Sequence, residues 1–358
     1  MKCLIRQPSR LVWSLLWTAS VFADETNPLT SKITPDSAKS KDFFTLIVLP
    51  DTQGYADTRH RETQKHWPEI GDQRACFYGQ TEWIKKNHRA RNIVMVTHVG
   101  DITQTEHDDE WKIADAAFKT IEPHVPYVLC SGNHDMGYSP QLRKTCQSRV
   151  SQFSRYFPPS RFTENSLYDA HFALDKQGHF REAGKTENYY LSFQAGGMDF
   201  MVITLEFKPR DEAIAWANQV AEKHPNHRIV LVTHGYLTKK GRLSGSDGYP
   251  IKGNSGQAIW EKFVSRHSNI FLVLSGHAGE SRLTSEGRHG NLVHQIQSDY
   301  WYFDLPRIKA GSGFLRILTF RPGQDRIQVE TYSPVLDEFL TRPSSKFSLP
   351  YAMKKKSG

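Results

Sequence analysis

Five short apolar segments of this chain each end in a polar turn, and this repetition constrains the fold more than any other feature. The segments cover residues 43–49, 93–99, 125–130, 229–232 and 270–274, and most are rich in β-branched residues. Runs of this length that stop at turns containing Gly, Asp or Asn predict buried β-strands. The chain is therefore predicted to contain at least five strands of this kind.

Stretches with amphipathic helical spacing lie between several of the predicted strands. They cover residues 80–87, 111–121, 211–223 and 256–266. Strands that alternate with helices predict an α/β layer fold, and ligands in such folds bind beside the carboxyl ends of the strands. We therefore expect the polar turns to meet at one edge and form a site.

The region after the fifth strand changes to shorter β-like segments. They cover residues 292–296, 313–320 and 326–332 and are expected to complete a second sheet. Residues 136–188 lack clear periodicity, which predicts a long insertion near the site. Residues 43–340 contain no linker and are predicted to be one domain, followed by a basic tail over residues 341–358.

The first 23 residues have the pattern of a secretory signal peptide. Three cations precede an apolar stretch over residues 11–22, and Ala23 closes a segment suited to cleavage. A membrane span needs about 20 apolar residues, so the stretch is too short for one; a buried N-terminal helix is the alternative. Residues 24–42 are predicted to be a flexible lead-in. We therefore expect an exported protein, periplasmic or secreted, with no transmembrane segment after cleavage.

The charge of the chain does not by itself identify a partner. The formal net charge is +8 at pH 7, which suits an anionic ligand. The basic residues are scattered, however, and no basic stripe with interleaved aromatic residues is present, so no specific nucleic-acid binding is expected. An exported nuclease is disfavoured for the same reason.

Three cysteines remain after the predicted cleavage. Cys130 lies in an apolar run and is expected to be buried. Cys76 and Cys146 are equally compatible with a disulfide in an oxidising compartment and with two unlinked thiols.

The residues at the predicted strand ends form a mixed oxygen and nitrogen ligand set. It consists of the carboxylates of Asp51 and Asp101, the amide of Asn133, and the imidazoles of His234 and His277. Such a set suits Zn, Mn, Fe or similar divalent ions, and the lack of Cys argues against a thiolate site. A lone ligand-competent residue after a strand is commonly structural, but five in succession indicate a metal centre.

Taken in order, these motifs resemble those of the calcineurin-like metallophosphoesterase superfamily. The corresponding segments are Asp51-Thr52-Gln53, Gly100-Asp101, Gly132-Asn133-His134-Asp135, Thr233-His234 and Gly276-His277-Ala278-Gly279. The resemblance spans roughly residues 43–335 and is greatest to exported bacterial members with a Gln in the first motif. It implies an α/β fold of two facing β-sheets flanked by helices, a four-layer sandwich with a two-metal site at one edge.

The resemblance also implies two divalent ions, each Mn, Zn, Fe or Mg, with Asp101 bridging them. The remaining ligands would divide into one set for each ion: Asn133, His234 and His277 for the first, Asp51 and Gln53 for the second. His134 would stabilise an equatorial phosphoryl oxygen or protonate the leaving group, and Asp135 would orient its imidazole.

Two departures from the family pattern weaken the second metal site. Gln53 replaces a His, and Ala278-Gly279 stands where the second His of Gly-His-x-His would be. A neutral amide is a weaker ligand than imidazole for borderline metals, so the second ion should bind less tightly or be a harder ion such as Mn or Mg. Glu280 is close enough in sequence to substitute, although a surface position or a pairing with Arg282 is the commoner role.

Other polar or aromatic residues follow strand ends or lie near them, although each is more commonly structural: Tyr55, His98, His107, Glu206 and His294.

These features predict an exported phosphoesterase that hydrolyses a phosphomonoester or phosphodiester by metal-activated hydroxide. The alternative is a catalytically weakened module that keeps one metal and recognises a phosphorylated ligand. His134 and Asp135 are not required to hold a metal, and their presence favours the enzyme.

Overall fold

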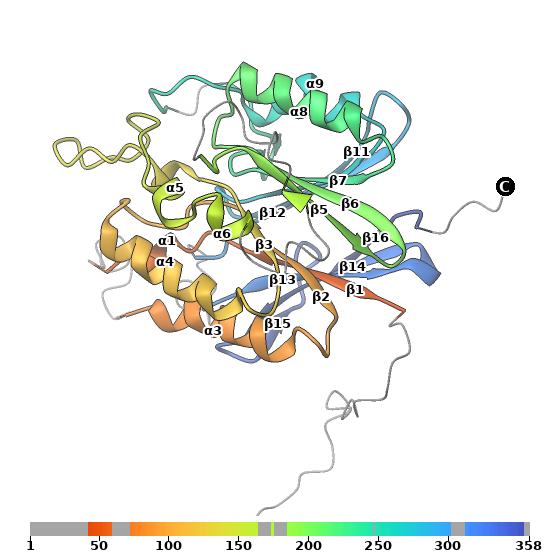
Figure 1. The fold of residues 1–358 in the computed structure, drawn as a ribbon, viewed down its shortest axis with the longest axis horizontal. Helices are drawn as coiled ribbons and strands as arrows, with labels where there is room; N and C mark the ends of the chain where they lie inside the picture. Colours follow the sequence, from red (N-terminus) through yellow and green to blue (C-terminus); the bar gives the residue numbers. More distant parts are fainter. Residues whose placement is uncertain are drawn as a thin grey trace, which may run out of the picture. The chain divides into compact units, whose positions relative to one another are not determined.

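Two β-sheets face each other in the centre of the fold, with helices on both outer sides (Figure 1). The computed structural model describes residues 42–58, 72–163, 173–174, 185–245, 248–301 and 312–353. All of them belong to one unit that extends from Ser40 to Gly358. The predicted signal peptide and residues 24–41 of the lead-in lie outside the described residues.

The first sheet combines strands from both ends of the chain. Its order is β15 (Glu338–Leu340), β14 (Arg326–Ser333), β13 (Leu315–Arg321), β1 (Phe44–Leu49), β2 (Ile93–His98) and β3 (Tyr127–Leu129), with β16 (Phe347–Pro350) also paired to β14. Strands β1, β2 and β3 are parallel, whereas β13 is antiparallel to β1. The expectation that residues 313–320 and 326–332 complete the second sheet is therefore wrong.

The second sheet is built from the middle of the chain. Its order is β11 (Glu280–Glu286), β12 (Leu292–Ser298), β10 (Ile270–Ser275), β7 (Arg228–Val232), β6 (Met198–Thr204), β5 (Tyr189–Ala195) and β4 (Ala173–Leu174). A short hairpin of β8 (Leu237–Thr238) and β9 (Gly241–Arg242) follows β7. The four strands β6, β7, β10 and β12 run parallel, so their carboxyl ends share one edge.

Apolar side chains from both sheets fill the space between them. The ring of Phe44 on β1 lies 5.5 Å from that of Phe200 on β6, and Phe320 on β13 lies 6.0 Å from Phe200. These rings belong to a cluster that also includes Leu46 and Val202. Burying apolar surface on both inner faces is what holds the two sheets together.

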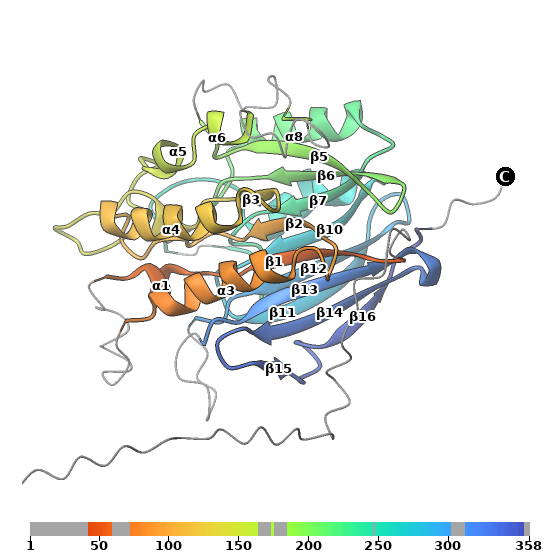
Figure 2. The ribbon, with the colours of Figure 1, turned by 60° about the horizontal axis from the view of Figure 1, so that its bottom comes forward.

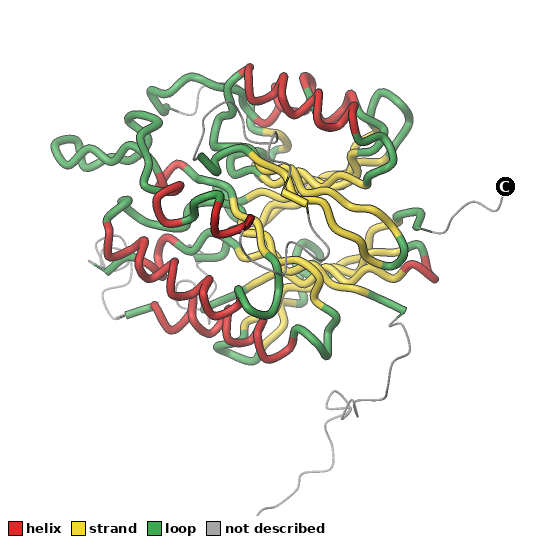
Figure 3. Tube along the Cα trace, viewed as in Figure 1, coloured by secondary structure: helices red, strands yellow, loops and turns green. Residues whose placement is uncertain are grey.

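Helices cover the outer face of each sheet (Figures 2 and 3). Helices α3 (Arg74–Asn87) and α4 (Asp108–Ile121) lie on the first sheet, and α8 (Asp211–Lys223) and α9 (Gly256–Lys262) lie on the second. The described helix–sheet–sheet–helix layers confirm the predicted α/β fold class. Shorter helical turns complete the described set: α1 (Gln53–Ala56), α5 (Phe153–Tyr156), α6 (Ser160–Thr163) and the 3₁₀ turns Asn133–Asp135, Val264–Arg266 and Pro322–Gln324.

The described part of the 136–188 insertion packs against α4 through aromatic side chains. Phe153 and Phe157 are buried, and their rings lie 6.1 Å and 6.4 Å from that of Trp111. Helices α5 and α6 are each four residues long. Elements of about one turn leave no readable periodicity in the sequence.

The folded part of the chain continues past residue 340, where the basic tail was expected to begin. Strand β16 pairs with β14, and its Leu349 is buried opposite Ile327. The ring of Tyr351 then stacks on that of Phe271 at a centroid distance of 4.0 Å. Only residues 354–358 of the expected tail lie outside the described residues.

The cysteines lie in separate environments. Cys130 is buried as expected, Cys76 is on α3, and Cys146 packs with Met136 and Phe207 in a small apolar cluster. Cys76 and Cys146 form no disulfide with each other, so the bonded alternative is wrong. Within the described ranges, no helix has both the length and the apolar character that crossing a bilayer requires.

Candidate metal centre

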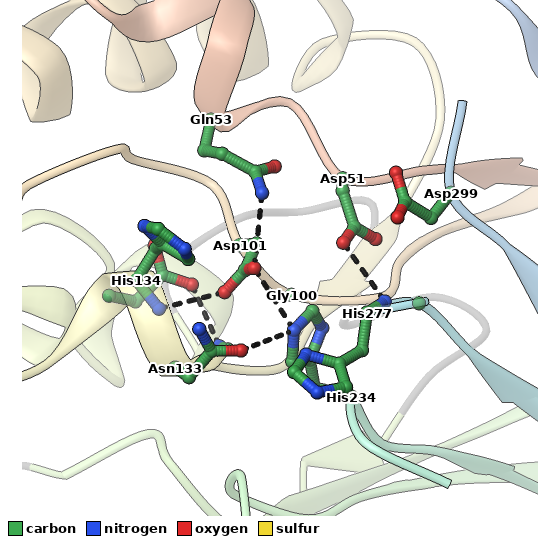
Figure 4. Close-up of polar contacts among 12 residues, drawn as sticks. Asp51, Gln53, Gly100, Asp101, Asn133, His134, His234, His277 and Asp299 are labelled. Atoms are coloured by element: carbon green, nitrogen blue, oxygen red, sulfur yellow. Dashed lines mark hydrogen bonds and ion pairs between the residues drawn. The ribbon is translucent and has the colours of Figure 1, made fainter. Parts of the chain in front are cut away.

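The carboxyl ends of five parallel strands, three in one sheet and two in the other, bring the predicted ligands together (Figure 4). In the first sheet, Asp51 follows β1, Asp101 follows β2 and Asn133 follows β3. In the second sheet, His234 follows β7 and His277 follows β10. Each ligand lies two to four residues past the end of its strand, so the pairing of the strands itself sets the positions of the turns.

His234 is the centre of the first ligand group. Its Nε2 atom lies 3.1 Å from Asp101 Oδ2 and 3.0 Å from Asn133 Oδ1. Its Nδ1 atom lies 2.8 Å from the carbonyl oxygen of Val99, to which it donates. With the Nδ1 proton fixed in this way, Nε2 is the atom available to a metal. Ligand atoms of Asp101, His234 and His277 all lie within 4.8 Å of one another, a spacing compatible with one shared ion.

The shifted pKa values in this ligand group indicate that a positive charge is stabilised between its side chains. Burial lowers the pKa of His234, but the Asp101 carboxylate, together with the Val99 carbonyl and the Asp135 charge, raises it above its ordinary value. Burial would raise the pKa of Asp101, but the imidazoles of His234 and His134 hold it well below its usual range. A divalent ion bound between these side chains would replace the Nε2 proton.

A second group of oxygen atoms lies beside the first. Asp51 Oδ2 accepts a hydrogen bond from the His277 backbone N–H at 2.9 Å, and Gln53 Nε2 donates to Asp101 Oδ2 at 3.2 Å. Asp299, directly after β12, lies next to Asp51 (Figure 4). Burial, followed by repulsion from Asp299 and Asp101, raises the pKa of Asp51.

Three oxygens of this second group are buried without a hydrogen-bond partner among the described residues: Asp51 Oδ1, Gln53 Oε1 and Asp299 Oδ1. Orphaned buried oxygens are costly, and clustered buried carboxylates are costlier still unless a cation compensates them. The residues present therefore fit a second divalent ion. Asp299 was not among the predicted ligands. It also follows a strand directly, but β12 contains four polar residues and lacks the apolar run that marked the other strands.

Two glycines allow the turns to approach the carboxylates. A Cβ atom at Gly132 would collide with Asp101 Oδ1, and one at Gly276 would collide with Asp51 Oδ1. Asp101 and His277 have positive φ angles of 51° and 83°. Non-glycine residues adopt this left-handed region rarely, and such strain is concentrated at functional sites.

His134 lies beside the metal centre with its imidazole held by a backbone group. Its Nδ1 atom is 2.8 Å from the carbonyl oxygen of Gln104, and its backbone N–H donates to Asp101 Oδ1 at 2.8 Å. The side chain lines the same cavity as the ligands. With Nδ1 engaged, Nε2 is the ring atom available to a ligand in that cavity.

Asp135 does not orient His134, so that prediction is wrong. Its carboxylate accepts hydrogen bonds from the backbone N–H groups of Ile102, Thr103 and Gly132 at 2.8–2.9 Å. The 3₁₀ turn over Asn133–Asp135 directs the carboxylate back to these amides. Asp135 instead links the Asp101 turn to the Asn133 turn. Burial, together with the negative charge of Asp101, raises the pKa of Asp135 to about 6.

Glu280 is not positioned as a substitute ligand. Both of its oxygens are occupied: Arg316 Nη2 donates to Oε1 at 2.8 Å, and Ser345 Oγ donates to Oε2 at 2.9 Å. Its carboxylate is buried, so the expected surface position is also wrong. Its cationic partners are Arg316 and Arg342. Arg282 is not one of them, and its guanidinium lies over the Phe347 ring.

The remaining sequence candidates have structural roles. His98 is buried and hydrogen-bonded to Thr52, and burial lowers its pKa to about 3. His294 contacts Thr284 and the Pro350 carbonyl. The other three lie outside the ligand groups: Tyr55 is buried in the core, His107 precedes α4, and Glu206 pairs with Arg149 and Arg210.

The metal centre opens into a cavity of about 540 Å³. Metal ligands and His134 form part of its lining, and the aromatic side chains of Tyr249 and Trp301 form another part. Lys239, in the turn between β8 and β9, adds an exposed cation. The cavity therefore combines a metal-ligand surface with aromatic walls and one positive charge.

The fold and this site together define a metallophosphoesterase-type domain. The chain belongs to the calcineurin-like phosphoesterase family, whose sequence model matches residues 44–280. This membership confirms the predicted superfamily, assigns the chain to metal-dependent phosphoester hydrolysis as a class of chemistry, and implies divalent ions.

One curated relative is YvnB, an uncharacterized protein of Bacillus subtilis (strain 168). It is 32% identical over 309 residues, which cover 84% of this chain and 20% of that protein. The chain thus spans about a fifth of the length of the curated relative it matches.

Two solved structures are similar at low sequence identity. One is GAP50, the anchor in the inner membrane complex of Plasmodium, with 11% identity, a TM-score of 0.43, and coverage of 88% of this chain and 90% of that one. The other is a protein serine/threonine phosphatase from Saccharomyces cerevisiae, with 12% identity, a TM-score of 0.29, and coverage of 88% and 83%.

Proposed function

We propose that this protein is an exported hydrolase that cleaves a phosphomonoester or a phosphodiester with the help of divalent ions. The observation that carries the proposal is the convergence of Asp101, Asn133, His234 and His277 on one point, with the His134 imidazole beside them. A structural metal site would need only the first four residues.

The ligands and their supports hold the reacting centre in place. Bound divalent ions would supply an activated water and neutralise the charge of the phosphoryl group. Asp101 and His234 are fixed on both sides, by the His134 backbone N–H and by the Val99 carbonyl. Asp135 locks the two ligand-bearing turns together through three backbone amides. Such preorganisation avoids rearranging the site during the reaction.

His134 is proposed to act on the proton of the leaving group. The Gln104 carbonyl holds the hydrogen on Nδ1, so Nε2 is the atom that carries or accepts the second proton. In its protonated form, the Nε2–H group can donate to a phosphoryl oxygen or to the departing alcohol oxygen. A positioned general acid typically accelerates such a step by about 10²–10⁴-fold.

The shape of the cavity favours an ester with an organic group rather than a bare phosphate. Its volume of about 540 Å³ lies within the range of about 300–1,000 Å³ that is usual for small-molecule sites. Tyr249 and Trp301 offer apolar surface to that group, and Lys239 offers a positive charge to a phosphoryl oxygen. The proposal of export rests on the sequence pattern of residues 1–23.

Metal-dependent turnover by the mature chain tests this function. The protein would be stripped of metal with a chelator, reloaded with Mn²⁺, Zn²⁺ or Mg²⁺, and assayed on p-nitrophenyl phosphate and bis-p-nitrophenyl phosphate. We expect turnover that requires an added ion and is lost in Asp101→Asn. Phosphate binding without turnover under every ion would overturn the proposal in favour of a non-catalytic module.

A further inference from the structure

Asp299 occupies the place left open by the missing second imidazole of the Gly-His-x-His motif. Gly279 stands at that motif position, and Asp299 is bound to it twice. The Asp299 backbone N–H donates to the Gly279 carbonyl at 3.0 Å, and the Gly279 N–H donates to Asp299 Oδ2 at 3.1 Å. These contacts extend the β11–β12 ladder by one pair beyond Glu280 and Ser298.

The other oxygen of Asp299 is directed to the site. Asp299 is 5% exposed, it lines the cavity of the metal centre, and its Oδ1 is buried without a hydrogen-bond partner among the described residues. Asp51 Oδ1 and Gln53 Oε1 are likewise buried without a hydrogen-bond partner among the described residues. The three residues that supply these oxygens, Asp51, Gln53 and Asp299, lie on the side of Asp101 that faces away from Asn133 (Figure 4).

The ladder also explains why Asp299, rather than Glu280, reaches the site. Neighbouring side chains of a strand point to opposite faces of the sheet. Glu280 follows Gly279, and its carboxylate lies on the opposite face with Tyr300 and Arg316. Asp299 is therefore the carboxylate in this ladder that faces Asp51.

We propose that Asp299 is a ligand of the second divalent ion and replaces the absent imidazole. The second ligand set is then Asp51, Gln53, Asp101 and Asp299, which donate only oxygen atoms. The first set includes two imidazoles. All-oxygen sets favour Mn²⁺ or Mg²⁺, whereas imidazole-containing sets suit Zn²⁺ and Fe²⁺. The two positions of the centre are therefore chemically distinct.

The inference shares its metal centre with the proposed function, but its test counts ions and does not depend on turnover. Metal-free wild-type protein would be titrated with Mn²⁺, and bound metal would be measured by elemental analysis after desalting. Electron paramagnetic resonance would be recorded on the same samples, because two neighbouring Mn²⁺ ions give a coupled spectrum and a single ion gives the isolated six-line spectrum.

Two variants of Asp299 and one matched control complete the design. Asp299→Asn removes the charge but keeps an oxygen that can accept a hydrogen bond from the Gly279 N–H. Asp299→Ala removes both oxygen atoms that could bind a metal. Glu280→Gln neutralises the adjacent buried carboxylate, which is bound to Arg316. Thermal unfolding of each metal-free form would establish that the variants are folded.

We expect two bound Mn²⁺ and a coupled spectrum in wild type and in Glu280→Gln. Asp299→Ala should bind one Mn²⁺ with the isolated spectrum, and Asp299→Asn should bind the second ion at least about 10-fold more weakly. The proposal is overturned if folded Asp299→Ala keeps both ions with wild-type affinity, or if wild type binds only one. Two ions without hydrolysis would defeat the proposed function and leave the assignment of Asp299 standing.

Discussion

The Nε2 atom of His234 lies 3.1 Å from Asp101 Oδ2 although both side chains are buried almost completely. Because Nδ1 of the same ring donates to Val99, a proton on Nε2 makes the imidazole a cation when no metal is present. The proton and the metal therefore compete for one atom. This competition makes metal binding dependent on pH.

The first prediction is that metal binding at neutral pH releases a proton. The pKa of His234 is raised above its ordinary value, so the metal-free protein holds this proton to higher pH than an ordinary histidine does. Calorimetric titration with Zn²⁺ in buffers of different ionisation enthalpy should show proton release on binding. The affinity should rise between pH 6 and pH 8, and an affinity independent of pH would contradict the prediction.

A second prediction separates His134 from the metal ligands. In His134→Asn, the backbone N–H still donates to Asp101, but the imidazole that carries or accepts the proton is lost. We expect kcat to fall by about 10²–10⁴-fold with unchanged metal content. Elemental analysis alongside steady-state kinetics would check both parts. Wild-type kcat in this variant would exclude His134 from the chemistry.

The third prediction concerns Asp135, whose carboxylate links the Asp101 turn to the Asn133 turn through hydrogen bonds. Asp135→Asn replaces one oxygen that accepts backbone hydrogen bonds with an NH₂ group, which faces an N–H donor. The lost hydrogen bonds should lower the free energy of unfolding of the metal-free protein by about 1–3 kcal/mol. Removing the charge of a buried carboxyl whose pKa is raised to about 6 offsets part of this loss at pH 8. Urea denaturation at pH 8 would measure the change. A matched Asp115→Asn substitution on α4, where the carboxylate pairs with Lys119 and Arg161, would show the effect of losing ion pairs without losing backbone hydrogen bonds.

The fourth prediction is that neutralising Asp299 raises, rather than lowers, the stability of the metal-free protein at pH 8. Burial raises the pKa of this carboxyl from 3.8 to about 6. Its contribution to stability is therefore fully present below about pH 4 and is lost as pH rises through about 6. Without metal, Asp299→Asn should exceed wild type in stability at pH 8, by at most about 3 kcal/mol.

Urea denaturation with a chelator at pH 4 and pH 8 checks this difference. The two proteins should converge at pH 4, where Asp299 of the wild type is largely protonated in the folded state. Saturating Mn²⁺ should reverse the order at pH 8, because only the wild type gains the full binding energy of the second ion. If metal-free wild type and Asp299→Asn were equally stable at both pH values, ionised Asp299 would not be destabilising and the prediction would be wrong.

The fifth prediction concerns export. When the full chain is expressed in a bacterium, the protein recovered from the periplasm or medium should begin at residue 24, after Ala23. Intact-mass measurement of fractionated cells would locate the cleavage. A chain lacking residues 1–23 should stay inside the cell, and uncleaved protein in the cytoplasm would contradict export.

The strand and helix pattern was sufficient to predict an α/β fold and most of the residues that meet at the candidate site, for a simple physical reason, whereas the two facing sheets followed from the family resemblance. Asp51, Asp101 and His234 each follow a buried strand, and parallel pairing brings such ends together without further information. The sheet in which β13 lies was mispredicted, because its partner β1 precedes it by about 270 residues. Local patterns do not encode so distant a pairing, nor that of β16 with β14.

The roles of Asp299 and Asp135 also depended on geometry that the sequence does not display. Asp299 belongs to the site because β12 is in register with β11, which places it opposite Gly279. Asp135 turns to three backbone amides because of a 3₁₀ turn only three residues long. Asp135 was thus easier to identify from its motif than to assign a role, whereas Asp299 was not identified as a candidate ligand at all.

The antiparallel pairing of β1 with β13 fixes when the metal centre can be completed during synthesis. Asp51 follows β1, yet one of the two neighbours of β1 is β13, which ends at Arg321, about 270 residues later in the chain. Asp299 likewise emerges from the ribosome about 250 residues after Asp51. The residues of the metal centre can therefore be assembled only after the chain has been made beyond Arg321. For an exported chain that crosses the membrane unfolded, the ions would then be acquired at the destination, from whatever metals that compartment supplies.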